Sequence, residues 1–176
     1  MLRYADLEGA MLTVKNVLVA TDFSEPSDAA LLYGRELAVR FGATLHALHV
    51  AQNIYFNTIG AENYTAVLPE LQEQIEQDAR RQLHQMLVDT DRSGPPSIPV
   101  VLTSSSPAMT IVDYAKAHDI DLIVMGTHGR GALAHFVMGS VAERVVRLAP
   151  CPVLTVRHPE REFVRPDSLA VVAQAS

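Results

Sequence analysis

Short apolar runs alternate along the chain with longer segments in which apolar residues recur every three or four positions. The short runs are rich in β-branched residues and predict buried strands; they cover 14–21, 44–50, 98–103, 121–125 and 152–156. The longer segments have the spacing of amphipathic helices; they cover 24–42, 68–91, 107–118 and 140–148. Strands that alternate with helices in this way build right-handed βαβ units, so the pattern predicts an α/β fold with a parallel sheet.

Residues that favour helix ends support these boundaries. Ser24 is a good N-cap with Pro26 in the first turn, and Gly42 stands where a C-cap glycine is expected. Ser106 is likewise a candidate N-cap for the third helix. Residues 51–68 have no clear periodicity and are expected to form a long loop.

The last part of the chain has a different composition from the rest. Residues 158–176 combine mixed charges, two prolines and a weakly apolar end, which is typical of a tail. We therefore expect one domain over 1–157 and a C-terminal tail over 158–176. At 176 residues the chain is long enough for one domain with a sizeable core.

The composition of the chain argues against some kinds of binding partner and indicates a cellular compartment. Apolar residues make up 48% and charged residues 19%, as in globular proteins, and the net charge of −6 disfavours a nucleic-acid-binding protein. No apolar run approaches the length of a membrane span, and Asp6 and Glu8 interrupt any secretory signal. Cys151 is the single cysteine and suits a reducing compartment. By elimination, we expect a cytoplasmic protein with no nucleic-acid or membrane partner.

The candidate ligand site follows the fourth predicted strand. Gly126, Gly129 and Gly131 let backbone amides approach a ligand, and Gly139-Ser140 begins the last helix, whose N-terminal amides attract anions. Ligands of open parallel sheets bind outside the carboxyl ends of the strands. The pattern therefore favours a polyphosphate site, with glycines that merely end a strand as the alternative.

Two familiar phosphate-binding patterns do not fit this loop. A Walker A loop would need Lys and Ser or Thr where Ala132 and Leu133 stand. Gly129-x-Gly131-x-x-Ala134 is similar to a dinucleotide-binding turn, but it follows the fourth strand instead of the first.

The spacing Gly126-x2-Gly129-x9-Gly139-Ser140 resembles the ATP-binding signature of the universal stress protein family. The segments KNVLVATDFSEPSDAAL, DLIVMGTHGRG and MGSVAERVVRLAPCPVLTVR carry the same resemblance, which covers about 15–50 and 104–157. It implies an open Rossmann-like sheet of five parallel strands in the order 3-2-1-4-5, with helices on both faces. It also implies a homodimer, commonly joined through the last strand, here 152–156.

The resemblance further implies ATP as the ligand and a set of contact residues. Gly126, Gly129, Arg130, Gly139 and Ser140 would contact the phosphates or ribose. Ala20 and Thr21 would line the adenine, and Asp22 would lie near the ribose or a bound Mg²⁺. Further candidates for packing around the nucleoside are Val50, Met125 and Val141. Many members have glycine where this chain has Ser106, so we expect a local change in loop geometry there.

Several other residues have a structural interpretation beside a functional one. His46 and His49 lie three apart on a strand and point to opposite faces, which argues against a shared metal ion. For His128, a phosphate contact and simple solvent exposure are both open interpretations. His135 is assigned no role. Cys151 lies between two prolines without a neighbouring base, which favours packing over nucleophilic chemistry.

The expected function is that of a nucleotide-dependent sensor or regulator in the stress response, acting with a protein partner that the sequence does not identify. The phosphate loop has Arg130 but no Lys and no water-orienting Gln or Glu, so ATP hydrolysis should be slow or absent. The alternatives are a slow ATPase or phosphotransferase, a nucleotide-free interaction scaffold, and another kind of α/β nucleotide protein. The sequence does not contain the extra domains or the catalytic motif that this last alternative would require.

Overall fold

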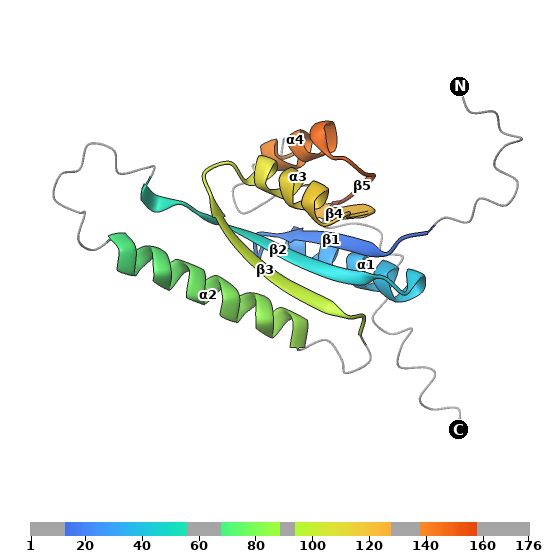
Figure 1. Cartoon of the computed structure of the whole chain (residues 1–176), viewed down its shortest axis with the longest axis horizontal. Coiled ribbons are helices and arrows are strands. Elements are labelled where there is room, and N and C mark those ends of the chain that lie inside the picture. The colour runs from blue at the N-terminus through green and yellow to red at the C-terminus, as the bar shows by residue number, and fades with distance from the viewer. Residues whose placement is uncertain (1–12, 56–67, 89–93, 128–137, 158–176) are drawn as a thin grey trace, which may run out of the picture.

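The computed structural model describes residues 13–55, 68–88, 94–127 and 138–157. Strands and helices alternate along the chain (Figure 1). The elements are β1 (Asn16–Thr21), α1 (Glu25–Phe41), β2 (Thr44–Gln52), α2 (Leu68–Val88), β3 (Ser97–Ser104), α3 (Pro107–Ala117), β4 (Leu122–Gly126), α4 (Ser140–Leu148) and β5 (Val153–Val156).

The strands form one parallel sheet in the order β3-β2-β1-β4-β5, which confirms the predicted fold class and strand order. β1 is the central strand, and its Ala20 pairs with Leu48 of β2 on one side and Met125 of β4 on the other. Since all strands run the same way, their carboxyl ends lie along one edge of the sheet.

Two apolar layers cover the faces of this sheet. Leu18 and Ala20 of β1 pack with α3 and α4, whereas Val17 and Val19 pack with α1 on the opposite face. This alternation follows from the two-residue period of a strand. Figure 1 shows α3 and α4 together on one side of the sheet and α1 and α2 on the other, so helices cover both faces as predicted.

Helix α1 packs closely against the sheet because a glycine faces it. A Cβ atom at Gly34 would lie 2.2 Å from Cγ2 of Val19. Gly42 ends the helix with φ of 64°, a left-handed conformation that glycine adopts without strain, so its predicted C-cap role is confirmed.

A buried arginine joins α1 to α2. The guanidinium of Arg35 donates a 2.7 Å hydrogen bond to the carbonyl of Met86 in the last turn of α2, and Arg35 is only 8% exposed. Burial lowers the pKa of Arg35, whose guanidinium nevertheless remains charged at neutral pH. A positive charge at the carboxyl end of a helix is favourable, so this contact holds α2 in place.

The structure corrects several local predictions. β2 continues to Gln52, so the segment without regular structure begins later than residue 51. Within α2, Leu71 is 43% exposed, whereas Gln72 is buried and its side-chain oxygen accepts the amide of Ile54. Ser106 is the N-cap of α3 as predicted, but its side chain makes no capping hydrogen bond.

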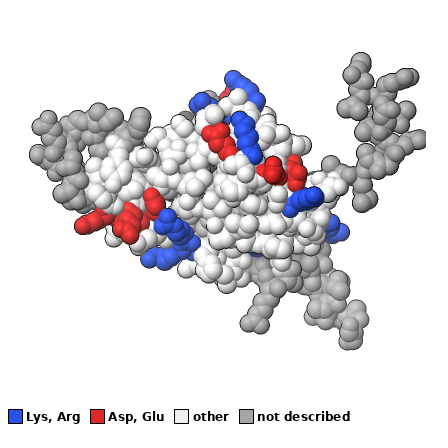
Figure 2. Space-filling view, in the orientation of Figure 1, with Lys and Arg blue, Asp and Glu red and all other residues white. Residues whose placement is uncertain are grey.

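The described surface has no extended basic stripe on the face that Figure 2 shows, where acidic and basic side chains lie interspersed. Among the described helices, none has both the length and the apolar character needed to cross a membrane.

Candidate functional site

The predicted site residues that the structure describes come from three strand ends and one helix start. Their carboxyl-terminal strand positions place them along one edge of the sheet, and α4 begins beside them. The nine described residues are Ala20, Thr21, Asp22, Val50, Met125, Gly126, Gly139, Ser140 and Val141. Gly129, Arg130 and His128 lie outside the described residues, as does His135.

The residues predicted to pack around a nucleoside share one face of the sheet. Ala20 and Met125 are buried neighbours within the apolar layer beneath α3 and α4. Val50 and Val141 are half-buried and pack against the same layer. Three strands and one helix thus contribute to an apolar wall at this edge, of the kind that typically lines small-molecule sites.

The two halves of the glycine signature are joined by a backbone hydrogen bond. The amide of Gly139 donates to the carbonyl of Thr127 at 2.7 Å, and the amide of Thr127 donates to Val156 of β5 at 2.8 Å. Gly126 and Gly139 are therefore held near each other although thirteen positions separate them in the sequence. Thr127 was not predicted as a site residue; its place inside the glycine signature was the available signal.

Helix α4 begins at this junction. Gly139 is its N-cap, with φ −73° and ψ 150°, and its carbonyl accepts the amide of Glu143 at 2.9 Å. Ser140 is the first helical residue and its side chain is exposed. Amides of a first helical turn point outward without intrahelical partners and bind anions well, so the start of α4 has the chemistry of a phosphate site.

The turn between β1 and α1 is held by a network of side-chain hydrogen bonds. Oγ1 of Thr21 accepts the amide of Phe23 at 3.0 Å and contacts Oγ of Ser27 at the same distance. Ser27 Oγ also accepts the amide of Ser24, while one carboxylate oxygen of Asp22 accepts both the amide and the hydroxyl of Ser24. The Asp22 carboxylate is consequently fixed in orientation.

Phe23 lies in this turn with a φ of 62°, which is unusual for a bulky residue. Its ring stacks on His49 of β2, with ring centroids 4.3 Å apart. His49 Nδ1 lies 2.9 Å from the carbonyl of Thr21, its register partner in β1. Because a carbonyl only accepts, Nδ1 carries the proton. Neither residue was predicted to belong to the site; the alternation of the strand showed only that His49 and His46 point to opposite faces.

Acidic groups gather around the same turn. Burial raises the pKa of Asp28, and the nearby charges of Asp22 and Glu25 raise it further. Such a negative potential would favour a cation near Asp22. In the described parts of the chain, no three His, Cys, Asp or Glu side chains form a metal-binding group, so Asp22 as an Mg²⁺ contact stays a prediction.

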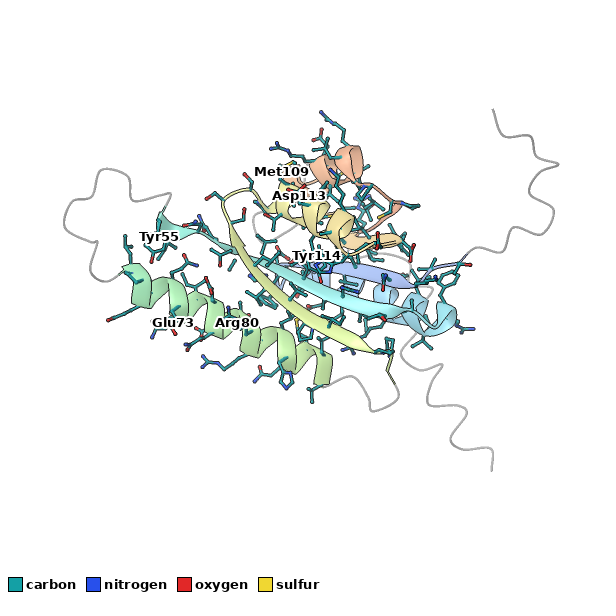
Figure 3. The ribbon with its side chains drawn as sticks, in the orientation of Figure 1. Tyr55, Glu73, Arg80, Met109, Asp113 and Tyr114 are labelled. Carbon is teal, nitrogen blue, oxygen red and sulfur yellow. The ribbon has the colours of Figure 1, made fainter. Side chains whose placement is uncertain are left out.

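The contacts of His46 and Cys151 indicate structural roles for both residues. Nδ1 of His46 lies 2.9 Å from the hydroxyl of Tyr114, which Figure 3 labels between α3 and the sheet, and Tyr114 stacks on His118. His46 and His49 thus contact different helices and turns, as their strand spacing indicates. Cys151 packs against the apolar layer beneath α3 and α4, and burial, together with the charge of Asp121, raises the pKa of its thiol.

Comparisons with known proteins agree with these observations. The model of the universal stress protein family matches residues 13–157. A universal stress protein of Methanocaldococcus jannaschii is 33% identical over 148 residues, which are 84% of this chain and 85% of that protein.

Solved structures share the fold. The universal stress protein UspA of Lactobacillus plantarum has a TM-score of 0.67 and 34% identity, over 84% of this chain and all of that chain. Two more distant structures have 19% identity. A universal stress protein in complex with cAMP has a TM-score of 0.56, over 83% of this chain and 98% of that one. The protein of Archaeoglobus fulgidus in complex with dAMP has a TM-score of 0.51, over 83% and 99%.

Proposed function

The chain belongs to the universal stress protein family, and we propose that it is an ATP-binding regulator that acts as a homodimer in the cytoplasm. Residues 1–157 form the nucleotide-binding domain in this proposal, and 158–176 form a tail. ATP occupancy would change the packing of the dimer or its contacts with a protein partner, and hydrolysis would be slow or absent.

The hydrogen bond between Gly139 and Thr127 is the observation that carries the ATP proposal. It brings the glycine that begins α4 beside the loop that continues from Gly126. Phosphates bound there would meet the amides of the first turn of α4, with Gly129, Arg130 and Ser140 as further contacts.

The apolar wall supports an adenine nucleotide in particular. Ala20, Val50, Met125 and Val141 offer aliphatic surface for a base beside the phosphate-binding turn. Thr21 would line the adenine together with Ala20, and Asp22 would lie near the ribose or an associated Mg²⁺. The structural neighbours that hold cAMP and dAMP carry the same base, which favours adenine over other bases.

The free edge of the sheet at β5 supports the homodimer. The carbonyls of Pro152 and Val156 accept amides from β4 and Thr127, so these alternate residues face inward. Val153 and Thr155 consequently direct their backbone groups outward, where a second copy of β5 could pair. The other edge strand, β3, contains Pro99, which has no amide to donate and suits an edge that stays unpaired.

The ATP proposal is tested by titration calorimetry with ATP, ADP and AMP, together with mass spectrometry of any nucleotide released on denaturation. We expect saturable ATP binding, and at 100 times the Kd a stabilisation of about 2.7 kcal/mol. A melting temperature unchanged by millimolar ATP would refute the proposal and favour a nucleotide-free scaffold. Phosphate release measured in parallel, with Asp22→Ala as the comparison, would identify a slow ATPase.

A further inference from the structure

The turn after β1 stores backbone strain beside the proposed nucleotide site. Phe23 and Asp119 are the two non-glycine residues with positive φ in the described parts of the chain, at 62° and 47°. Asp119 has a short polar side chain of the kind that tolerates this conformation, whereas Phe23 does not. A bulky residue keeps a left-handed conformation only where its surroundings hold it there, and such strain is concentrated at functional sites.

His49 of the neighbouring strand makes two contacts with this turn. Its imidazole stacks on the Phe23 ring with an interplanar angle of 30°, and its Nδ1–H donates to Thr21, the last residue of β1. The two contacts therefore hold both sides of Asp22, which lies between Thr21 and Phe23. Val50, the next residue of β2, belongs to the apolar wall.

We propose that Phe23 and His49 are positioning residues for the nucleotide, and that they hold the 21–24 turn so that Asp22 faces the ligand. This inference rests on the proposed ATP site. The Asp22 carboxylate is already tied to Ser24 within the turn, so the orientation of the turn as a whole sets the direction of that carboxylate. Neither Phe23 nor His49 needs to touch the nucleotide.

Two glycine substitutions distinguish a positioning role in ATP binding from an effect on the stability of the fold. Phe23→Gly removes the left-handed strain together with the ring stack, so the melting temperature of the ligand-free protein should change little. The Kd for ATP should nevertheless rise by about fivefold or more, because the turn is no longer held in one conformation. Asp119→Gly is the matched control: it relieves the same kind of strain just before β4, at the opposite end of the strands, and should leave the Kd unchanged.

Substitutions of His49 separate its ring from its hydrogen bond. His49→Phe keeps a ring for stacking and removes the donor to Thr21, whereas His49→Asn keeps a donor near the position of Nδ1 and removes the ring. Each should weaken ATP binding, and exchange of the amide hydrogens of residues 22–24 should become faster in the ligand-free protein.

The outcomes distinguish this inference from the proposed function. If the wild-type protein does not bind ATP, the proposed function fails and this inference with it. If the wild-type protein binds and the Phe23 and His49 variants bind equally well, only the positioning role is refuted. Amide exchange at 22–24 that is unchanged in His49→Phe would also refute it, whatever the affinity for ATP.

Discussion

The amide of Gly139 lies 2.7 Å from the carbonyl of Thr127 and donates a hydrogen bond to it. This hydrogen bond joins the start of α4 to the residue that follows β4. Gly129 and Arg130 lie between these two positions in the sequence. A ligand that contacts both segments must approach their backbones closely, which a glycine permits and a side chain hinders. Added side chains at these glycines are therefore the most direct test of the site.

We predict that Gly129→Val combined with Gly139→Val abolishes measurable ATP binding. Position 139 has φ −73° and ψ 150°, which valine adopts readily, so the fold should survive with a penalty of about 1 kcal/mol for the weaker N-cap. The added side chains would occupy the space where phosphates approach the backbone. Calorimetry measures the affinity, and circular dichroism without ligand is the control. ATP affinity retained in a folded double variant would contradict the assignment of the site.

Gly34→Ala should destabilise the protein because its new methyl group would overlap Val19 at 2.2 Å. Overpacking of this kind costs about 1–3 kcal/mol, and chemical denaturation will measure it. Leu32→Ala on the exposed side of α1, where Leu32 is 46% exposed, is the control and should change the stability much less. Equal stability of the Gly34→Ala and wild-type proteins would show that α1 can move away from the sheet without cost.

Arg35→Met should also destabilise the fold, by about 1.5–3 kcal/mol, because methionine keeps much of the apolar stem and loses the charged hydrogen bond to Met86. Arg40→Met is the matched control. The Arg40 side chain is 76% exposed where it pairs with Glu36, and its loss should cost below about 0.5 kcal/mol. Denaturant titrations that rank the two variants in the opposite order would contradict the role of Arg35 as a link between α1 and α2.

Acidification should lower the free energy of unfolding because of the buried His46. Burial lowers its pKa in the folded protein, and the charge of His118 lowers it further. The unfolded chain then binds more protons than the folded chain near and below the ordinary histidine pKa of about 6.5, so the free energy of unfolding falls as the pH falls through that value. His46→Phe with Tyr114→Phe removes both hydrogen-bonding partners at once and should flatten this dependence. Urea denaturation at pH 7.5 and 5.5 will show whether the slope persists.

Thr155→Pro should convert the proposed dimer into a monomer. Thr155 directs its amide away from β4, so proline removes an outward donor without breaking a hydrogen bond of the sheet. Val101→Pro, which alternation along β3 places outward on the other edge strand, is the control and should leave the dimer intact. Light scattering after size-exclusion chromatography distinguishes the two masses. A Thr155→Pro protein that remains dimeric would place the interface elsewhere.

Features that depend on a single residue were predicted better from the sequence than features that depend on contacts between distant parts of the chain. Gly42 as a helix C-cap depends on one residue's own conformational freedom, and it was predicted correctly. The burial of Gln72 in α2 does not follow from the helical period, because the amide of Ile54, from another part of the chain, supplies the partner that Gln72 needs. Ser106 was predicted correctly as the N-cap of α3, but its side chain makes no capping hydrogen bond, because the residue type permits this bond without requiring it.

The alternation of apolar runs and helical periods was by itself enough to determine the parallel α/β class, and the glycine spacing selected the loop proposed to bind phosphate. The strand order and the individual contact residues required the family resemblance as well. Only the tertiary structure decided that Thr127 bonds to Gly139 and that Phe23 is held in a left-handed turn by His49. The physical reason is range: helix and strand patterns are governed by residues a few positions apart, whereas these contacts join positions that meet only after the sheet has assembled.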